Sequence, residues 1–100
     1  MTKTTGIDAY IGFAVRAKKV TFGLECLLRL RQAPEVVLYD ETLGQSAKKK
    51  AQNFCESKGS AFLPVEEGYL NNVLKRNNVK IVAILDRSLA DQIKRISASE

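Results

Sequence analysis

The chain of 100 residues is 45% hydrophobic and 27% charged, which argues against disorder and allows one domain, residues 1–100, with a single modest core. Its formal net charge is +5, and residues 1–32 carry six basic but only two acidic side chains. Nearly all of the excess charge therefore lies in the first third and favours a polyanionic partner. No run approaches the roughly 20 apolar residues of a membrane span, and residues 1–10 lack a signal-peptide core, so we expect a cytoplasmic protein.

A helix is predicted over residues 7–17, where apolar side chains recur at helical spacing. Thr5 and Asp8 are its possible starting residues. Because Tyr10 and Phe13 widen the apolar face, we expect this helix to be packed along most of its length.

Strands and helices then alternate to the end of the chain. Pro64 indicates an edge position for the third strand, and Ser88 is predicted to cap the last helix. The predicted strands are residues 20–22, 35–40, 61–65 and 79–85, and the helices between them are residues 24–30, 47–58 and 67–76. This alternation predicts an α/β fold, a three-layer α/β/α sandwich with a mixed four-stranded sheet.

The residues that most enzymes and metal sites require are missing. The chain has no histidine, no phosphate loop of the GxxxxGK[ST] kind and no GxGxxG, so we expect a non-catalytic protein without cofactor or metal. Asp40 and Asp86 both end predicted strands and could hold a metal together, as in a small hydrolase. A turn or a helix cap is the favoured interpretation of each aspartate.

Two further groups are expected to be structural. Cys26 and Cys55 fall on apolar positions of predicted helices, which favours buried, reduced thiols over a disulfide or a redox pair. The run Lys48–Lys50 could contact RNA, but it spans most of a helical turn, so a solvated helix face is at least as good an explanation.

One basic stretch, Arg16–Gln32, holds five of the sixteen basic residues and a single acid. In its middle, Gly23 lies where the predicted strand leads into the predicted helix. A glycine there lets another backbone approach closely, and the free amides of a first helical turn favour anions. With basic side chains on both sides, this junction predicts a phosphate-rich ligand.

Five segments resemble the ribosomal-protein superfamily of kink-turn RNA binders, the L-seven-Ae and L-thirty-e group, and most closely its small bacterial YlxQ-type members. The segments are residues 12–19 (GFAVRAKK), 23–29 (GLECLLR), 35–41 (EVVLYDE), 48–59 (KKKAQNFCESKG) and 82–90 (VAILDRSLA). They occur in the family's order, and the resemblance covers almost the whole chain in register. The resemblance implies a non-catalytic RNA-binding protein, ribosomal or ribosome-associated, that recognises structured, kink-turn-like RNA. The alternative is a protein-interaction module on the same fold with a degraded RNA face.

The resemblance also implies a site, because family members use the helix at this junction to hold a sharply bent RNA. Gly23 would admit the RNA backbone, Glu25 would contact a base edge and Arg29 would meet a phosphate. Cys26 stands where strong binders have glutamate or glutamine, and Lys18 replaces a glycine of the family's "RAGK" stretch. The loop before the last strand would flank the same RNA. The basic side chains of Lys18, Lys19 and Arg29 would contact phosphates. The predicted RNA-binding residues are Lys18, Lys19, Gly23, Leu24, Glu25, Cys26, Arg29, Lys75, Arg76, Asn77 and Asn78.

Overall fold

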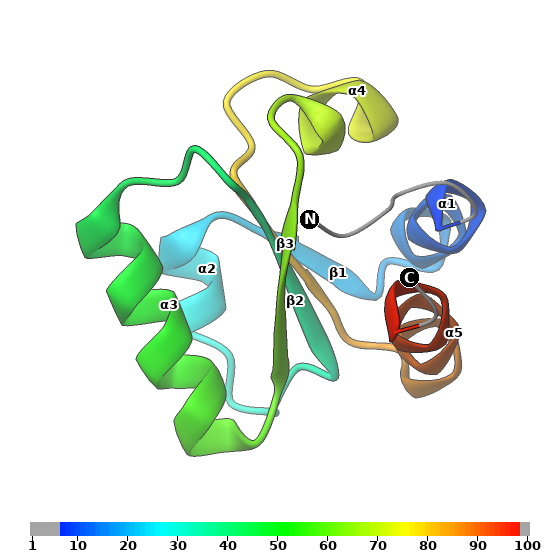
Figure 1. Cartoon of the computed structure of the whole chain (residues 1–100). Coiled ribbons are helices and arrows are strands. Elements are labelled where there is room, and N and C mark those ends of the chain that lie inside the picture. Colours follow the sequence, from blue (N-terminus) through cyan, green and yellow to red (C-terminus); the bar gives the residue numbers. More distant parts are fainter. Residues whose placement is uncertain (1–6, 99–100) are drawn as a thin grey trace.

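The computed structural model describes residues 7–98, in which helices and strands alternate as predicted (Figure 1). Thr5, a predicted starting residue of the first helix, lies outside the described residues. The elements are α1 (Asp8–Arg16), β1 (Val20–Phe22), α2 (Leu24–Leu28), β2 (Val36–Asp40), α3 (Gln45–Lys58), β3 (Ala61–Val65), α4 (Tyr69–Leu74), β4 (Ile81–Ile84) and α5 (Arg87–Ala98).

The four strands form one mixed sheet in the order β1-β4-β2-β3. β2 runs parallel to β3, whereas β4 runs antiparallel to both β1 and β2. The two interior strands are buried at every residue, as expected from their continuous apolar sequences. Pro64 lies in the edge strand β3, where its missing N–H leaves no gap in the sheet.

Helices cover both faces of the sheet, so the predicted α/β/α sandwich is confirmed (Figure 1). On β2, Val36 and Leu38 face a core cluster completed by α1, α4 and α5, whereas Val37 and Tyr39 face a second cluster under α2 and α3. This alternation is the two-residue period of a strand.

Some expectations about the helices are wrong. Phe13, which was expected to widen the packed face of α1, is 46% exposed, because the helix offers only one stripe to the sheet and this side chain falls outside it. α2 ends at Leu28 instead of residue 30. Asp86, not Ser88, caps α5: its Oδ1 accepts a hydrogen bond of 2.9 Å from the Leu89 N–H.

The two strand-ending aspartates do not share a site. The Asp40 N–H donates to the Lys80 carbonyl (2.8 Å) just before β4, whereas Asp86 follows the end of β4. Because β2 and β4 are antiparallel, the two carboxylates lie at opposite ends of the sheet. The metal pair is therefore rejected, and the two residues form a turn and a helix cap.

Asp40 is fully buried and joins three segments by its side chain. Its Oδ1 accepts hydrogen bonds from the Thr42 N–H (2.8 Å) and the Thr42 hydroxyl (2.5 Å), and its Oδ2 accepts one from the Gly68 N–H (2.9 Å). The Lys80 ammonium lies 3.8 Å from Oδ1 and also donates to the Thr42 hydroxyl. Since Gly68 begins α4 and Lys80 precedes β4, this network holds both ends of the segment that contains α4 and the following loop.

Lys18 adopts a left-handed conformation, with φ of 59°, at the position where the family stretch has glycine. A side chain is strained there, whereas glycine is not. We expect Lys18→Gly to raise the free energy of unfolding by about 0.5 to 1 kcal/mol in urea titrations. Lys19→Gly is the matched control: it also removes one charge but relieves no left-handed residue, so we expect it to lower stability. A lower stability for Lys18→Gly would contradict the prediction.

Candidate nucleic-acid interface

Gly23 forms the junction between β1 and α2, as predicted. Its backbone has φ of 87° and ψ of 161°, a region that only glycine adopts without strain. Its N–H donates to the Ile81 carbonyl (3.0 Å), which extends the pairing of β1 with β4, and its carbonyl accepts from the Leu27 N–H (3.1 Å), which begins α2. A Cβ added to Gly23 would meet nothing within 4 Å. The space in front of the junction is therefore open.

The packing of α2 decides which of its side chains face solvent. Leu27 is fully buried, and Leu24 packs against the same core cluster. Glu25, Cys26 and Arg29 are exposed. The Arg29 N–H donates to the Glu25 carbonyl (3.2 Å), so these two residues lie one turn apart on the outer side of the helix.

The two cysteines differ. Cys55 is buried in α3, and burial raises the pKa of its thiol to about 11, as expected of an inert core residue. Cys26 is exposed, so the expectation that it is buried is wrong. The reason is its position on α2, where the adjacent Leu27 takes the inward direction and Cys26 points away.

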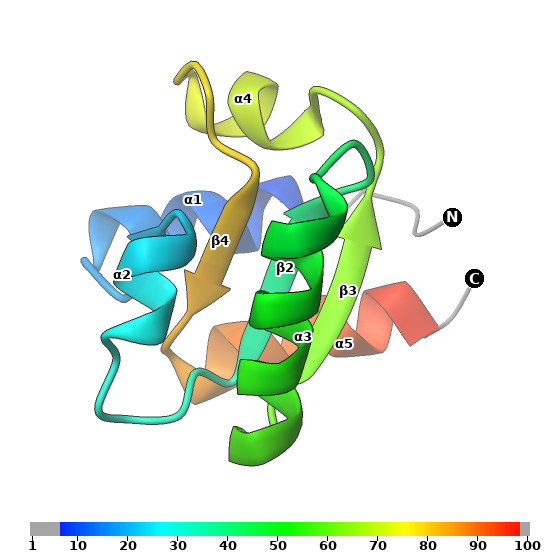
Figure 2. The ribbon, with the colours of Figure 1, turned by 90° about the vertical axis from the view of Figure 1, so that its left-hand side faces the viewer.

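The loop between α4 and β4 lies at the same end of the sheet as the junction, above α2 in Figure 2. Its residues Lys75, Arg76, Asn77 and Asn78 are all exposed. The Asn71 side-chain oxygen accepts a hydrogen bond of 2.9 Å from the Val79 N–H, which closes the loop against α4.

A cation–π contact joins the loop to the junction. The guanidinium carbon of Arg76 lies 4.5 Å from the centroid of the Phe22 ring, and Phe22 directly precedes Gly23. We call the resulting surface the junction surface; it comprises Gly23, Glu25, Arg29, Lys75, Arg76, Asn77 and Asn78. It carries three cations and one carboxylate, and within residues 7–98 no acidic side chain forms a salt bridge with any of the three. An open surface of this charge suits an anion.

Four predicted site residues are not part of the junction surface. Leu24 packs inward against the core cluster, and Cys26 is exposed on α2 but offers only a weak thiol hydrogen bond. The other two, Lys18 and Lys19, lie elsewhere. The Lys19 carbonyl accepts a hydrogen bond of 2.7 Å from the Leu85 N–H, at the end of β1 farthest from Gly23. At a rise of roughly 3.3 Å per residue, the four steps from Lys19 to Gly23 span about 13 Å. Lys18 and Lys19 are exposed but do not belong to the junction surface, because the extended β1 separates residues that are close in the sequence.

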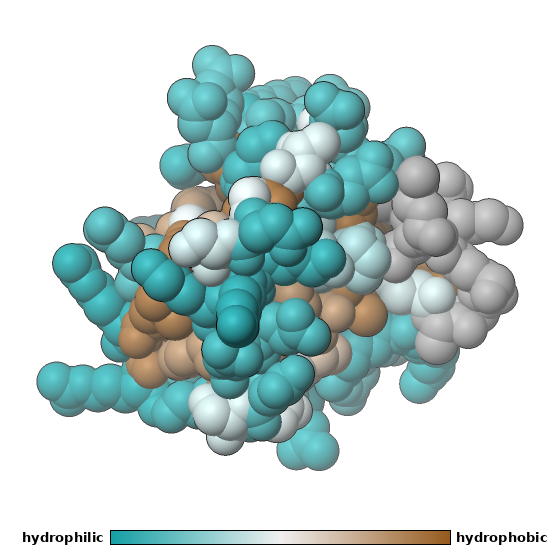
Figure 3. All heavy atoms as spheres, turned by 60° about the vertical axis from the view of Figure 1, so that its left-hand side comes forward, coloured by the Kyte–Doolittle hydropathy of each residue, from teal (hydrophilic) through white to brown (hydrophobic). Residues whose placement is uncertain are grey.

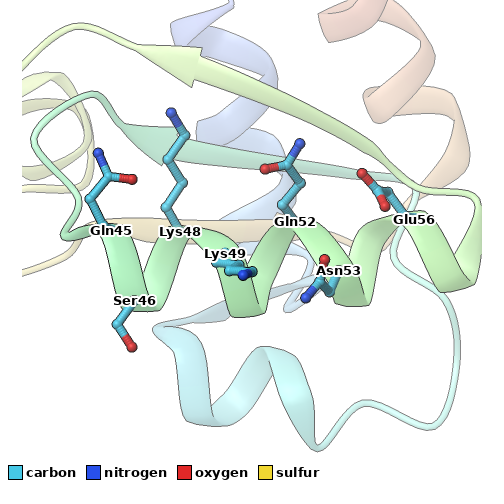
Figure 4. A pocket seen from close by; sticks show the side chains of 7 residues that line it. All are labelled: Gln45, Ser46, Lys48, Lys49, Gln52, Asn53 and Glu56. Carbon is cyan, nitrogen blue, oxygen red and sulfur yellow. The ribbon is translucent and has the colours of Figure 1, made fainter.

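The lysine run on α3 does not form one surface. The Lys48 ammonium lies 5.5 Å from the centroid of the Tyr39 ring, whereas Lys49 and Lys50 are exposed. Figure 4 shows the hollow along this helix: Lys48 and Gln52 point towards the strands, while Ser46 and Asn53 point towards α2. Such divergent side chains are typical of a solvated helix face.

Three residues near the junction surface were not predicted. The Phe22 ring contacts the Arg76 guanidinium, and the Asn71 side chain closes the α4–β4 loop. Arg16 lies near Arg76, beside a hollow between α1 and α4. Arg16 belongs to the basic stretch Arg16–Gln32, so its charge was a sequence signal for a place near the predicted RNA-binding site. Nothing in the local sequence indicates the partners of Phe22 and Asn71, because both contacts depend on how distant segments meet.

The fold and this surface together define a small α/β/α domain with an open, basic strand-to-helix junction. No family model and no curated protein matches the chain. A solved structure, described as that of a protein with unknown function from Bacillus halodurans, is similar with a TM-score of 0.84 over 93% of this chain and 97% of that chain, at 18% sequence identity. This similarity shows a shared fold. Within residues 7–98, no helix has the length and apolar character needed to cross a membrane.

Proposed function

We propose that this protein is a non-catalytic, cytoplasmic RNA-binding protein of the kink-turn-binding ribosomal-protein superfamily, associated with the ribosome or with another structured RNA. The observation that carries the proposal is the contact of Arg76 with Phe22, which brings the α4–β4 loop against the junction at Gly23. Two segments that the family resemblance assigns to RNA, distant in the sequence, thereby form one basic surface.

Each part of the junction surface has a role in the proposed complex. The open space in front of Gly23 admits a ribose-phosphate backbone, and Arg29, Lys75 and Arg76 contact phosphates. The Glu25 carboxylate accepts hydrogen bonds from guanine N1 and N2. The amides of Asn77 and Asn78 both donate and accept, so they suit base edges or sugar hydroxyls.

We expect the protein to bind a kink-turn RNA more tightly than a plain duplex, with an affinity that falls steeply as salt rises. Arg29→Ala and Arg76→Ala are each expected to reduce the slope of log affinity against log salt by about 0.7 to 0.9, because each removes one phosphate contact. Gel-shift titrations at several salt concentrations measure this slope. Arg95→Ala on α5, which follows the end of β4 opposite to the α4–β4 loop, is the matched control and is expected to leave the slope unchanged.

Glu25→Ala distinguishes base recognition from charge attraction. It is expected to change the preference among RNA sequences more than the overall affinity, because a carboxylate gains nothing from phosphates. Unchanged binding in the Glu25, Arg29 and Arg76 variants would reject the site. Equal, weak binding of both RNAs would reduce the proposal to a general RNA binder.

A protein-interaction module is the second candidate. Leu28 is exposed on α2 beside Arg29. Figure 3 shows that hydrophobic atoms also reach the surface in the left part of that view, among hydrophilic side chains. No binding to either RNA, together with a dimer in solution that Leu28→Lys dissociates, would favour this function over RNA binding.

A further inference from the structure

The helices α1 and α4 run in the same direction, from right to left in Figure 2, and contact each other. The Tyr69 hydroxyl at the start of α4 donates a hydrogen bond to the Asp8 carboxylate at the start of α1. At the other end, Arg16 of α1 and Arg76, which follows α4, line one hollow of about 300 Å³. We call the outer surface of this helix pair, from Asp8 and Glu67 to Arg16 and Arg76, the α1–α4 face.

The N-terminal end of the α1–α4 face is acidic. Asp8, Glu66 and Glu67 are all exposed and border a hollow of about 500 Å³. Within residues 7–98, no basic side chain forms a salt bridge with any of these three carboxylates. This end therefore carries three negative charges without an internal counter-charge.

The C-terminal end of the α1–α4 face is basic. Arg16, Lys75 and Arg76 are exposed, and in the part of the chain that the structure describes they form no salt bridge. The guanidinium carbon of Arg16 lies 4.8 Å from the Phe13 ring centroid, and that of Arg76 lies 4.5 Å from the Phe22 ring centroid. Three positive and three negative charges cancel on this face, so the net charge of +5 lies on the rest of the chain.

An aromatic side chain lies between the two charged ends. Phe13 is 46% exposed, and beside it an added Cβ on Gly12 would meet nothing within 4 Å. Val73 and Leu74 line the same hollow from the side of α4. Helix dipoles favour acids at the N-terminus and bases at the C-terminus, but they do not account for an exposed ring between the two. An aromatic centre with a charged rim is typical of a surface that binds another protein.

The order of the charges fits a second copy of the chain. A twofold rotation about an axis through the Phe13 region reverses the helix directions and places each acidic end over the basic end of the other copy. Asp8 and Arg16 are eight residues apart on α1, or about 12 Å, which exceeds the screening length of about 8 Å in physiological salt. The two ends therefore act separately, and like charges oppose the parallel arrangement. RNA or an acidic peptide would match the basic end but be repelled by the carboxylates.

We propose that the α1–α4 face is a self-association surface, on which two copies of the chain pair about a twofold axis. The acidic end of each copy contacts the basic end of the other, and the two Phe13 rings meet near the axis. Because the helices have only nine and six residues, the face is smaller than the roughly 800 Å² per partner of a standard interface. We therefore expect a weak dimer, with a dissociation constant on the order of 10 to 100 µM that rises with salt.

Two charge-reversed variants test this pairing by sedimentation equilibrium of the full chain without RNA. The wild type is expected to pass from the mass of one chain towards twice that mass as its concentration rises. Arg16→Glu combined with Arg76→Glu makes both ends negative, and Glu66→Lys combined with Glu67→Lys makes both ends positive. Each variant alone should be monomeric where the wild type is dimeric. An equal mixture of the two should dimerise again, because each end then faces an end of opposite charge.

Three further variants serve as controls and as a test of the centre. Lys49→Glu combined with Lys50→Glu changes the net charge as much as the double arginine variant does, but on α3, on the opposite side of the sheet. This variant and Leu28→Lys on α2 are expected to dimerise like the wild type. Phe13→Ala should weaken the dimer at least about 10-fold, because a central aromatic side chain contributes a large share of an interface's binding energy. All the substituted side chains are exposed, so circular dichroism is expected to show folded proteins.

Several results would overturn the proposal. They are a wild type that stays monomeric up to about 1 mM, charge-reversed variants that dimerise unchanged, and a mixture that stays monomeric. A mass that grows beyond the dimer would indicate head-to-tail assembly instead of a closed twofold pair. Dissociation by Leu28→Lys but not by the charge reversals would place the interface on α2. Since no RNA is present, each result is independent of the proposed function.

Discussion

Asp40→Asn is expected to lower the free energy of unfolding by about 2 to 3 kcal/mol at pH 7. The carboxylate is fully buried and accepts three hydrogen bonds, and an amide in its place would direct N–H groups at donors that already point inward. A loss of this size is a large share of the roughly 5 to 15 kcal/mol that stabilises a typical domain. Urea titration monitored by circular dichroism measures it.

Asp91→Asn is the matched control. Asp91 is 53% exposed and lies 3.7 Å from the Lys94 ammonium one turn further along α5. An exposed pair of this kind is worth less than about 0.5 kcal/mol, so Asp91→Asn should change stability little. Equal losses in the two variants would show that the buried network does not stabilise the fold.

The effect of Asp40→Asn is expected to depend on pH. Burial by itself raises the pKa of Asp40, but the hydrogen bonds from Thr42 and Gly68, together with the Lys80 charge, outweigh it and hold the pKa below its ordinary value of 3.8. Because the pKa is lower in the folded state, the ionised carboxylate stabilises the protein fully above about pH 5, and this stabilisation is lost as the pH falls through the folded pKa. The difference between wild type and Asp40→Asn should therefore be constant from neutral pH to about pH 5 and shrink at lower pH. A difference that stays constant in strong acid would contradict this assignment.

Leu27→Ala is expected to cost about 3 kcal/mol of unfolding free energy, whereas Leu28→Ala, at the next position, should cost less than about 1 kcal/mol. Leu27 is fully buried under α2, and Leu28 is 42% exposed on the same helix. α2 has five residues and no side-chain cap, so tertiary packing and not intrinsic propensity holds it. Urea titrations of the two variants provide the comparison, and similar costs would mean that α2 is not anchored by Leu27.

Leu27→Ala also tests how the junction surface is supported. Glu25 and Arg29 lie on the outer side of α2, and Leu27 fixes the helix against the sheet. We therefore expect Leu27→Ala to weaken RNA binding at a temperature where the protein is still folded, and Leu28→Ala to leave RNA binding unchanged. Reduced binding in Leu28→Ala alone would place Leu28 itself in the interface.

The sequence alone determined the order of the helices and strands, including the apolar runs that form β2 and β4, the edge position of β3 and the glycine junction between β1 and α2. Each of these depends on local chemistry. Apolar runs predict interior strands, Pro64 lacks an N–H to donate within a sheet, and Gly23 has a backbone conformation that other residues avoid. None of these features depends on contacts between segments that are distant in the sequence.

Only the tertiary structure decided which charged residues lie together. The antiparallel pairing of β4 with β1 brings Arg76 onto Phe22 and leaves Lys19 at the far end of β1. The antiparallel pairing of β4 with β2 separates Asp40 from Asp86. The physical reason is that strand order and direction arise from the burial of whole sheet faces under helices. A strand that is covered on both faces, as β2 and β4 are, has a continuous apolar sequence whichever way its neighbour runs.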